Sequence, residues 1–197
     1  MDTPEIWIEI DHGKRRLAAL LEDLTPEQWR MASLCEAWRV RDVAAHLTMA
    51  PTITKRELLR DAARGRGNFN RTIRDSALRR AAVRTDAQIL DDLRATTGAR
   101  RLAPGTFIRD PLLDVLVHTQ DIAVPLGIKV TAPTEPVVEA LDWVWRRGFP
   151  FRPGRTFRGR RAVATDTQWS RGRGADVVAP VSDLLLMATG RLPVPAQ

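Results

Sequence analysis

The chain has 197 residues, of which 44% are hydrophobic and 28% charged, and its formal net charge is +7. This composition is typical of a globular protein and allows one domain with a well-filled core, or a main domain with a small appendage. No apolar window approaches the roughly 20 residues of a membrane span, and the acidic start MDTPEIWIEID differs from a signal peptide, so we expect a cytoplasmic protein.

Two helices with clear start signals are predicted first. Thr3-Pro4-Glu5 begins a helix whose apolar residues recur at helical spacing as far as Leu24. A capping-box signal, Thr25-Pro26-Glu27-Gln28, then opens a short helix. Next, the apolar pattern of residues 40–47 predicts a second long helix, which Pro51 kinks or interrupts.

Two more amphipathic helices follow an arginine-rich stretch. We expect residues 64–84 to form a mobile connection with one helical turn or more. A third helix begins at Asp86 and ends near Gly98, and a fourth is capped by Asp110-Pro111. Four amphipathic helices with such connections predict a mainly α fold, a four-helix bundle over residues 1–127.

The sequence pattern changes after residue 127, where long amphipathic helices give way to shorter segments. Residues 129–136 form a proline-punctuated linker, and residues 137–147 a tryptophan-rich helix. Short β-like runs between residues 150 and 180 precede an apolar helix that ends at Gly190. We therefore expect residues 128–197 to be a small α/β region packed on the bundle.

Two of the three histidines occur in one frame, D-V-x-x-H, at Asp42–His46 and Asp114–His118, with Asp121 shortly after the second. On a helix, residues i, i+4 and i+7 share a face, so Asp114, His118 and Asp121 form a polar stripe. Because Cys35 is the single cysteine, an internal disulfide is excluded and a metal ion needs nitrogen and oxygen ligands. Two histidines and a carboxylate on facing helices are typical of catalytic zinc and of non-haem iron.

Spacing alone leaves two interpretations open. A histidine in an apolar helix is often a hydrogen-bonded core residue, and an Asp–His pair four residues apart is common on solvated faces. Against this, burying a carboxylate without a compensating charge costs roughly several kcal/mol. If both frames acted alike, Asp42, His46, Asp114 and His118 would surround one ion symmetrically.

Three segments carry a resemblance to a known family. SLCEAWRVRDVAAHL, DVLVHTQDIAVPLG and AVATDTQWSRGRGADVVAPVSDLLLMATGR, in this order, resemble the mycothiol-dependent maleylpyruvate isomerase family, part of the DinB-like metalloenzyme superfamily. The likeness runs from about residue 12 to residue 191. It implies a DinB-like four-helix bundle that holds a divalent metal, usually zinc, with iron or nickel as alternatives.

The resemblance also implies roles for the residues of both frames. His46, Asp114 and His118 become the metal ligands. Asp42 becomes a partner that orients an imidazole or caps the helix start, and Asp121 a partner that orients His118. The isomerases have Glu where this chain has Asp114, which is one methylene shorter, so a shifted metal or a bridging water is expected here.

The implied activity is metal-dependent chemistry with a low-molecular-weight thiol. The thiol of mycothiol would reach the metal as thiolate and add to a small electrophile, giving isomerisation or S-transfer. Arg191, in the terminal TGR, is the candidate for holding substrate carboxylates; the alternative is a residue favoured there by the helix dipole. Cys35 has no neighbouring base in the sequence, and we expect a small buried residue rather than a nucleophile.

Two other function classes are considered. One is a non-catalytic protein that binds a small ligand on the same scaffold, with a vestigial or absent metal. The other is nucleic-acid binding, because the stretch from Arg146 to Arg173 holds nine arginines against one acid, Asp166. No recognisable nucleic-acid-binding motif accompanies this charge, so we expect a solvated basic face.

Overall fold

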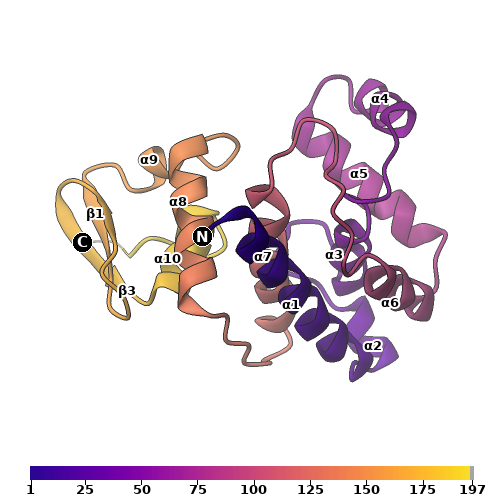
Figure 1. The fold of residues 1–197 in the computed structure, drawn as a ribbon, viewed down its shortest axis with the longest axis horizontal. Helices are drawn as coiled ribbons and strands as arrows, with labels where there is room; N and C mark the ends of the chain where they lie inside the picture. Colours follow the sequence, from indigo (N-terminus) through magenta and orange to yellow (C-terminus); the bar gives the residue numbers. More distant parts are fainter. Residues whose placement is uncertain (196–197) are drawn as a thin grey trace. The chain divides into compact units, whose positions relative to one another are not determined.

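The computed structural model describes residues 1–195, which form two compact units (Figure 1). The helical unit spans Thr3–Val130. The C-terminal unit runs from Thr131 onward and includes Met1–Asp2. Each is described by itself.

The helical unit is built around a four-helix bundle (Figure 1). Its helices are α1 (Thr3–Glu22), α2 (Pro26–Arg30), α3 (Val40–Leu47), α4 (Lys55–Arg64), α5 (Phe69–Ala82), α6 (Asp86–Ala95) and α7 (Arg109–Ala123). Both α1 and α3 pack against α6 and α7, so these four helices form a closed ring. They are the four that apolar spacing predicted, and the bundle is confirmed. In addition, α5 packs on α3, α4 on α5 and α2 on α3.

The core of the bundle consists of the residues that set its sequence pattern. Leu17 and Leu21 of α1, Val43 of α3, Leu93 of α6 and Ile122 of α7 are all almost completely buried in one cluster. Burying such a side chain contributes roughly 1.5–3 kcal/mol, which makes the facing stripes the main force that assembles the ring. Each stripe thereby fixes which face of its helix points inward.

The second predicted helix is interrupted near Pro51 and not kinked there. α3 covers eight residues and stops at Leu47, where the Thr48 hydroxyl donates to the Ala45 carbonyl. Turns occupy residues 48–52, and Thr54 then caps α4 by accepting from the Glu57 N–H. The helix therefore ends before Pro51, and α3 and α4 are separate helices.

The prediction for residues 64–84 was wrong in the main point, because most of them form the fourteen-residue helix α5. The Asn68 side chain caps it by accepting from the Arg71 N–H. Small residues including Thr72, Ala77 and Ala81 are buried. The packing of α5 on α3 stabilises a segment whose local sequence is too polar to predict a long helix.

The C-terminal unit combines helices with a small sheet. Its elements are α8 (Thr134–Arg147), α9 (Pro153–Thr156), β1 (Arg160–Ala164), β2 (Ser170–Gly172), β3 (Ala175–Ala179) and α10 (Val181–Ala188). The strand order is β2-β1-β3, with β2 antiparallel and β3 parallel to β1. The helices α8 and α10 pack together, and α10 also packs on β1. The β-like runs predicted between residues 150 and 180 include the strands β1 and β3, so the α/β character of this region is confirmed.

Over residues 1–195, the chain has no helix with both the length and the apolar character that crossing a membrane requires.

Candidate metal centre

The two D-V-x-x-H frames lie on facing helices of the bundle. His46 is in the last turn of α3, and Asp114 and His118 are one turn apart on α7. Because α3 and α7 pack against each other, both imidazoles point into the same space. The ring centroids of His46 and His118 are 5.0 Å apart, in an edge-to-face arrangement.

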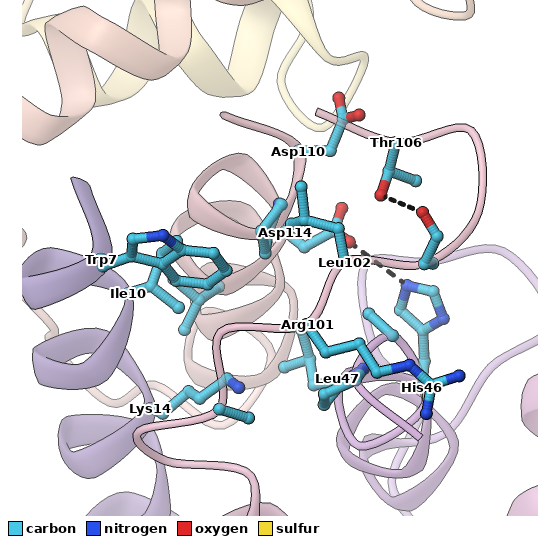
Figure 2. Close-up of a pocket in the computed structure, with 16 residues that line it drawn as sticks. Trp7, Ile10, Lys14, His46, Leu47, Arg101, Leu102, Thr106, Asp110 and Asp114 are labelled. Carbon is cyan, nitrogen blue, oxygen red and sulfur yellow. Dashed lines mark hydrogen bonds and ion pairs between the residues drawn. The ribbon is translucent and has the colours of Figure 1, made fainter. Parts of the chain in front are cut away.

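The three residues that the resemblance implies as ligands come together. One ligand atom each of His46, Asp114 and His118 can be chosen so that all lie within 4.8 Å of one another. His46 Nε2 is 3.9 Å from Asp114 Oδ2, the contact drawn as a dashed line in Figure 2. The Asp114 side chain is 38% exposed, so this corner of the cluster is open to solutes.

A second set of contacts holds His118 from behind. Its Nδ1 lies 2.8 Å from Oδ2 of Asp121, whose side chain is fully buried. The thiol of Cys35 donates to the same carboxylate oxygen at 3.0 Å, and its sulfur is 3.7 Å from His118 Nδ1. Cys35, His118 and Asp121 therefore form a second group of close potential ligands, which shares His118 with the first.

These contacts change the acidity of His118. Burial by itself would lower the pKa of this imidazole, but the hydrogen bonds to Asp121 and Cys35 outweigh burial and raise its pKa from 6.5 to about 10. A metal ion that binds His118 must therefore displace a proton. With Nδ1 held by Asp121, Nε2 is the nitrogen left for an ion.

Trp38 covers both imidazoles. Its ring centroid is 5.2 Å from that of His46 and 6.1 Å from that of His118. The side chain is buried, and its indole N–H has no acceptor among residues 1–195. Such an orphaned donor indicates that a water molecule or a ligand completes the site.

The residues present fit a divalent metal. Two imidazoles and a carboxylate are a donor set that zinc and non-haem iron both accept. Metal bonds of about 2.0–2.2 Å require ligand atoms roughly 3.4 Å apart, so small rotations of His46, Asp114 and His118 would close the triangle. The buried partner of His118 and the orphaned Trp38 donor are the features that such a centre needs around it.

Asp42 and Arg191 lie in other surroundings. The Asp42 carboxylate accepts from the backbone N–H of Arg39 at 2.9 Å and from its guanidinium. Asp42 therefore caps the start of α3, one of the two roles that the resemblance allowed. Arg191 follows α10 in the C-terminal unit, where it donates to the Thr189 carbonyl and lies over the Phe151 ring.

A pocket opens beside the cluster, within the helical unit. The space between its lining atoms, with the open solvent at its mouth included, is about 550 Å³. His46 and Asp114 form part of its wall, together with side chains from α1 and from the loop between α6 and α7 (Figure 2). Two of the three candidate ligands therefore face this pocket.

Sequence reasoning missed three residues of this region. Cys35 is half-buried against Asp121, although those residues are 86 positions apart and no local pattern links them. Trp38 was assigned no part in the site, although its ring contacts both candidate imidazoles. Lys14 was assigned none either, yet its side chain lines the pocket. The local sequence signal for the site was the frame D-V-x-x-H, which occurs on two apolar helices.

Comparisons with known proteins agree with this architecture. The sequence profile of the mycothiol maleylpyruvate isomerase N-terminal domain matches residues 10–104. No curated protein matches the sequence. The matched residues include His46, whereas Asp114 and His118 follow them.

Two crystal structures share the fold. One is that of a histidine-to-alanine mutant of the mycothiol-dependent maleylpyruvate isomerase, with 11% identity and a TM-score of 0.61. The other is that of the mycothiol-dependent maleylpyruvate isomerase, with 12% identity and a TM-score of 0.54. Each match covers 100% of this chain and 97% of the other. Residues 10–104 are therefore similar to the mycothiol maleylpyruvate isomerase N-terminal domain, and the whole chain shares the fold of the two isomerase structures.

Proposed function

We propose that the protein is a metal-dependent enzyme that uses a low-molecular-weight thiol, mycothiol, for isomerisation of a small electrophile or for S-transfer to it. The observation that supports this most strongly is the approach of His46, Asp114 and His118 to within 4.8 Å beside a pocket. The similarity of residues 10–104 to the mycothiol maleylpyruvate isomerase N-terminal domain supports the thiol. The cytoplasm, where small thiols stay reduced, is the compartment we expect.

Each residue of the centre has a separate task in this proposal. His46, Asp114 and His118 hold the metal, and Asp121 fixes the orientation of His118 through Nδ1. Trp38 shields both imidazoles from water on the buried side. The exposed edge of Asp114 leaves the pocket side open for thiol and substrate.

When bound, the metal supplies Lewis acidity that lowers the pKa of the thiol, so that a thiolate is present at neutral pH. The pocket residues would hold the electrophile next to the sulfur, since proximity and orientation account for much of such a rate gain. Addition of the thiolate to one carbon of a double bond leaves the electron pair on the other carbon. Rotation about the new single bond and expulsion of the thiolate then give isomerisation, whereas protonation of that carbon by solvent with retention of the C–S bond gives S-transfer. Arg191 is kept, on the resemblance alone, as a candidate for binding a substrate carboxylate.

Metal analysis of protein purified without a histidine tag is the first test. We expect close to one equivalent of a divalent metal, either as purified or after adding zinc, iron or nickel and removing the excess. Less than about a tenth of an equivalent under all these conditions would contradict the proposal. It would favour the rival reading, a small-ligand-binding protein on the same scaffold.

Activity is tested on the metal-loaded protein with mycothiol and maleylpyruvate, the substrate in the names of the structural relatives. Conversion or adduct formation that needs both the thiol and the metal would support the proposal. If the metal-loaded protein leaves this pair unchanged, the same assay with other electrophilic double bonds and epoxides separates a different substrate from a protein without thiol chemistry.

A further inference from the structure

A buried lysine lines the pocket beside the candidate metal centre. Lys14 is on the same face of α1 as Trp7 and Ile10, and all three contribute to the pocket wall (Figure 2). Its side chain is only 7% exposed, although lysine is among the residues that proteins bury least often. Burial lowers the pKa of its ammonium group, which is the direction expected for a cation that water does not fully solvate.

The neighbours of Lys14 compensate its charge only in part. The ammonium group donates to the carbonyl oxygen of Thr96 at 3.0 Å. Asp11 is the nearby carboxylate, but its two oxygens already accept from the Gly98 N–H at 2.8 Å and from the Arg100 guanidinium at 2.7 Å. Among residues 1–195, no carboxylate lies within ion-pair distance of the Lys14 nitrogen.

A second cation enters the pocket from the loop after α6. Arg101 lines it together with Lys14, and its guanidinium donates to the Ile53 carbonyl at 2.8 Å. That contact uses one of its five N–H donors. A site with two histidines, one carboxylate and a divalent ion would itself carry a net positive charge, so Lys14 and Arg101 add to a positive potential on one side.

The rest of the pocket suits a small molecule with an apolar body. The apolar part of its wall includes Trp7, Ile10, Leu47, Leu102 and Val115. Two acidic side chains, Asp110 and Asp114, also line the pocket (Figure 2). The part of the wall that holds Lys14 and Arg101 therefore favours the anionic end of a small molecule with an apolar body.

We infer that Lys14 and Arg101 form a carboxylate-binding subsite, which orients a small carboxylate-bearing substrate with its reactive carbon toward His46 and Asp114. The inference rests on the proposed function for the identity of the reaction, but binding of the carboxylate does not depend on it. An anion at this position completes the hydrogen bonding of a buried ammonium group, and this is the physical reason for keeping a lysine inside an apolar wall. Lys14 sets specificity here; it takes no part in the bond-making step.

The subsite is tested with succinate, which carries carboxylates but no electrophilic double bond, and with succinamide, its uncharged analogue. Calorimetric titrations use the full-length protein in metal-free form and in zinc-loaded form. We expect succinate to bind both forms and succinamide to bind neither measurably. Lys14→Met, which keeps the length and apolar stem, should weaken succinate binding about tenfold or more, and Arg101→Gln by a smaller factor.

Lys129→Met is the matched control, since Lys129 is exposed and does not line the pocket. It should bind succinate as the unchanged protein does. Far-UV circular dichroism and thermal unfolding check that Lys14→Met is folded, and Arg101→Gln, at an exposed position, tests the subsite without that risk.

Succinate affinity unaltered by both Lys14→Met and Arg101→Gln would overturn the inference. So would binding that needs zinc and ignores both substitutions, because the carboxylate would then be bound by the metal. A protein that takes up no metal but loses succinate binding in Lys14→Met would refute the proposed function and keep the subsite. Normal metal uptake and thiol-dependent activity, with succinate binding unchanged by the variants, would refute the subsite alone.

Discussion

At the residue scale, His118 is the centre of the site because its two nitrogens face different environments. Nδ1 is held by the buried Asp121 carboxylate, which also accepts from Cys35. Nε2 is thereby the nitrogen left to bind an ion beside His46 and Asp114. In the proposed centre, an imidazole fixed in this way loses little rotational freedom when a metal binds.

The first prediction concerns metal content. His46→Ala and His118→Ala should each abolish metal binding, because each removes one of three ligands. Asp121→Ala should only weaken it, by about 10- to 100-fold, since it removes a partner of a ligand. Metal content is measured by elemental analysis after dialysis against a buffered metal solution.

The third histidine supplies the control for these variants. His12 is exposed, pairs with Glu9 and lies outside the candidate cluster, so His12→Ala should bind metal as the unchanged protein does. Equal loss of metal in the His46, His118 and Asp121 variants would show that the ligands have been assigned wrongly.

Trp38 gives a prediction about stability. Trp38→Ala should lower the free energy of unfolding by about 3–5 kcal/mol, because it leaves a cavity against both imidazoles. Trp38→Phe keeps an aromatic ring there, so its free energy of unfolding should fall by clearly less than that of Trp38→Ala. Urea unfolding of the metal-free proteins measures both values; equal losses would mean that the indole N–H matters more than ring packing.

At the element scale, the close approach of α1 to α7 positions the pocket wall. Gly13 of α1 faces Val115, the residue after Asp114, and a Cβ at position 13 would lie 2.9 Å from one Val115 methyl carbon. Glycine inside a helix is less favourable than alanine by roughly 1 kcal/mol, so its presence here is explained by the contact and not by helix formation. The two helices meet at this point because one of them has no side chain.

Gly13→Ala should therefore destabilise the protein by about 1–2 kcal/mol, since overpacking outweighs the gain in helix propensity. In a Val115→Ala background the same change should be neutral or stabilising, because the methyl groups that it meets are gone. Denaturant unfolding of the four proteins gives the coupling energy. Equal effects of Gly13→Ala in both backgrounds would contradict the proposed contact.

Asp11 of α1 binds the loop after α6 through hydrogen bonds. Asp11 accepts from the Gly98 N–H and from Arg100, and this loop continues into the pocket residues Arg101 and Leu102. Burial acts to raise the pKa of Asp11, but the hydrogen bonds from Arg100 and Gly98 outweigh burial and hold its pKa below the ordinary 3.8. A carboxyl with a depressed pKa stabilises the fold above its unfolded-state pKa, and this stabilisation is lost as the pH falls through the folded-state value.

Asp11→Asn should therefore be less stable than the unchanged protein by about 1–3 kcal/mol at pH 6. The difference should shrink as the pH falls below 3.8, because the unchanged protein then loses its ionised carboxylate. Urea unfolding of both proteins at pH 6 and at about pH 3 measures it. A difference that stays constant over this range would show that the charge of Asp11 contributes nothing.

At the scale of the whole molecule, the candidate ligands and the pocket all belong to the helical unit, whereas Arg191 belongs to the C-terminal unit. Several arginines of the basic stretch are engaged within the C-terminal unit. Arg161 pairs with Asp176 at 2.7 Å, and Arg171 pairs with Asp142 at 3.0 Å. These ion pairs account for part of the charge that raised the question of nucleic acids.

The division of labour between the units can be tested at Arg191. Arg191→Met should leave the metal content at the level of the unchanged protein. If Arg191 holds a substrate carboxylate, the same variant raises KM several-fold in the thiol-dependent assay, and Arg191→Lys recovers part of the loss. An unchanged KM would favour the alternative, an arginine that only satisfies the end of α10 through the Thr189 carbonyl.

The sequence predicted the elements that carry strong local signals. Apolar residues at helical spacing identified all four bundle helices, and Leu17, Val43, Leu93 and Ile122 of these helices are buried in the core. Such spacing indicates a helix because it places the apolar side chains on one face, which can then be buried. The prediction was wrong for α5, whose stability comes from packing small residues on α3 and not from its own composition. The sequence left open whether the second helix is kinked or interrupted near Pro51, and the turns at residues 48–52 interrupt it.

For the candidate site, the sequence by itself determined which residue types were available. One cysteine, three histidines and two D-V-x-x-H frames restricted any metal centre to nitrogen and oxygen ligands on two helices. Helical periodicity also determined that Asp114 and His118 share a face.

Only the tertiary structure decided which groups meet across the bundle. The Asp42 carboxylate accepts from Arg39 at the start of its own helix. The Asp121 carboxylate instead points into the bundle and contacts His118 and Cys35. Lys14 became a pocket residue because α1 packs beside α7. The contacts of Cys35 with Asp121 and of Lys14 with Thr96 join residues 86 and 82 positions apart, and local spacing carries no information about the side chain that such a long-range contact brings close.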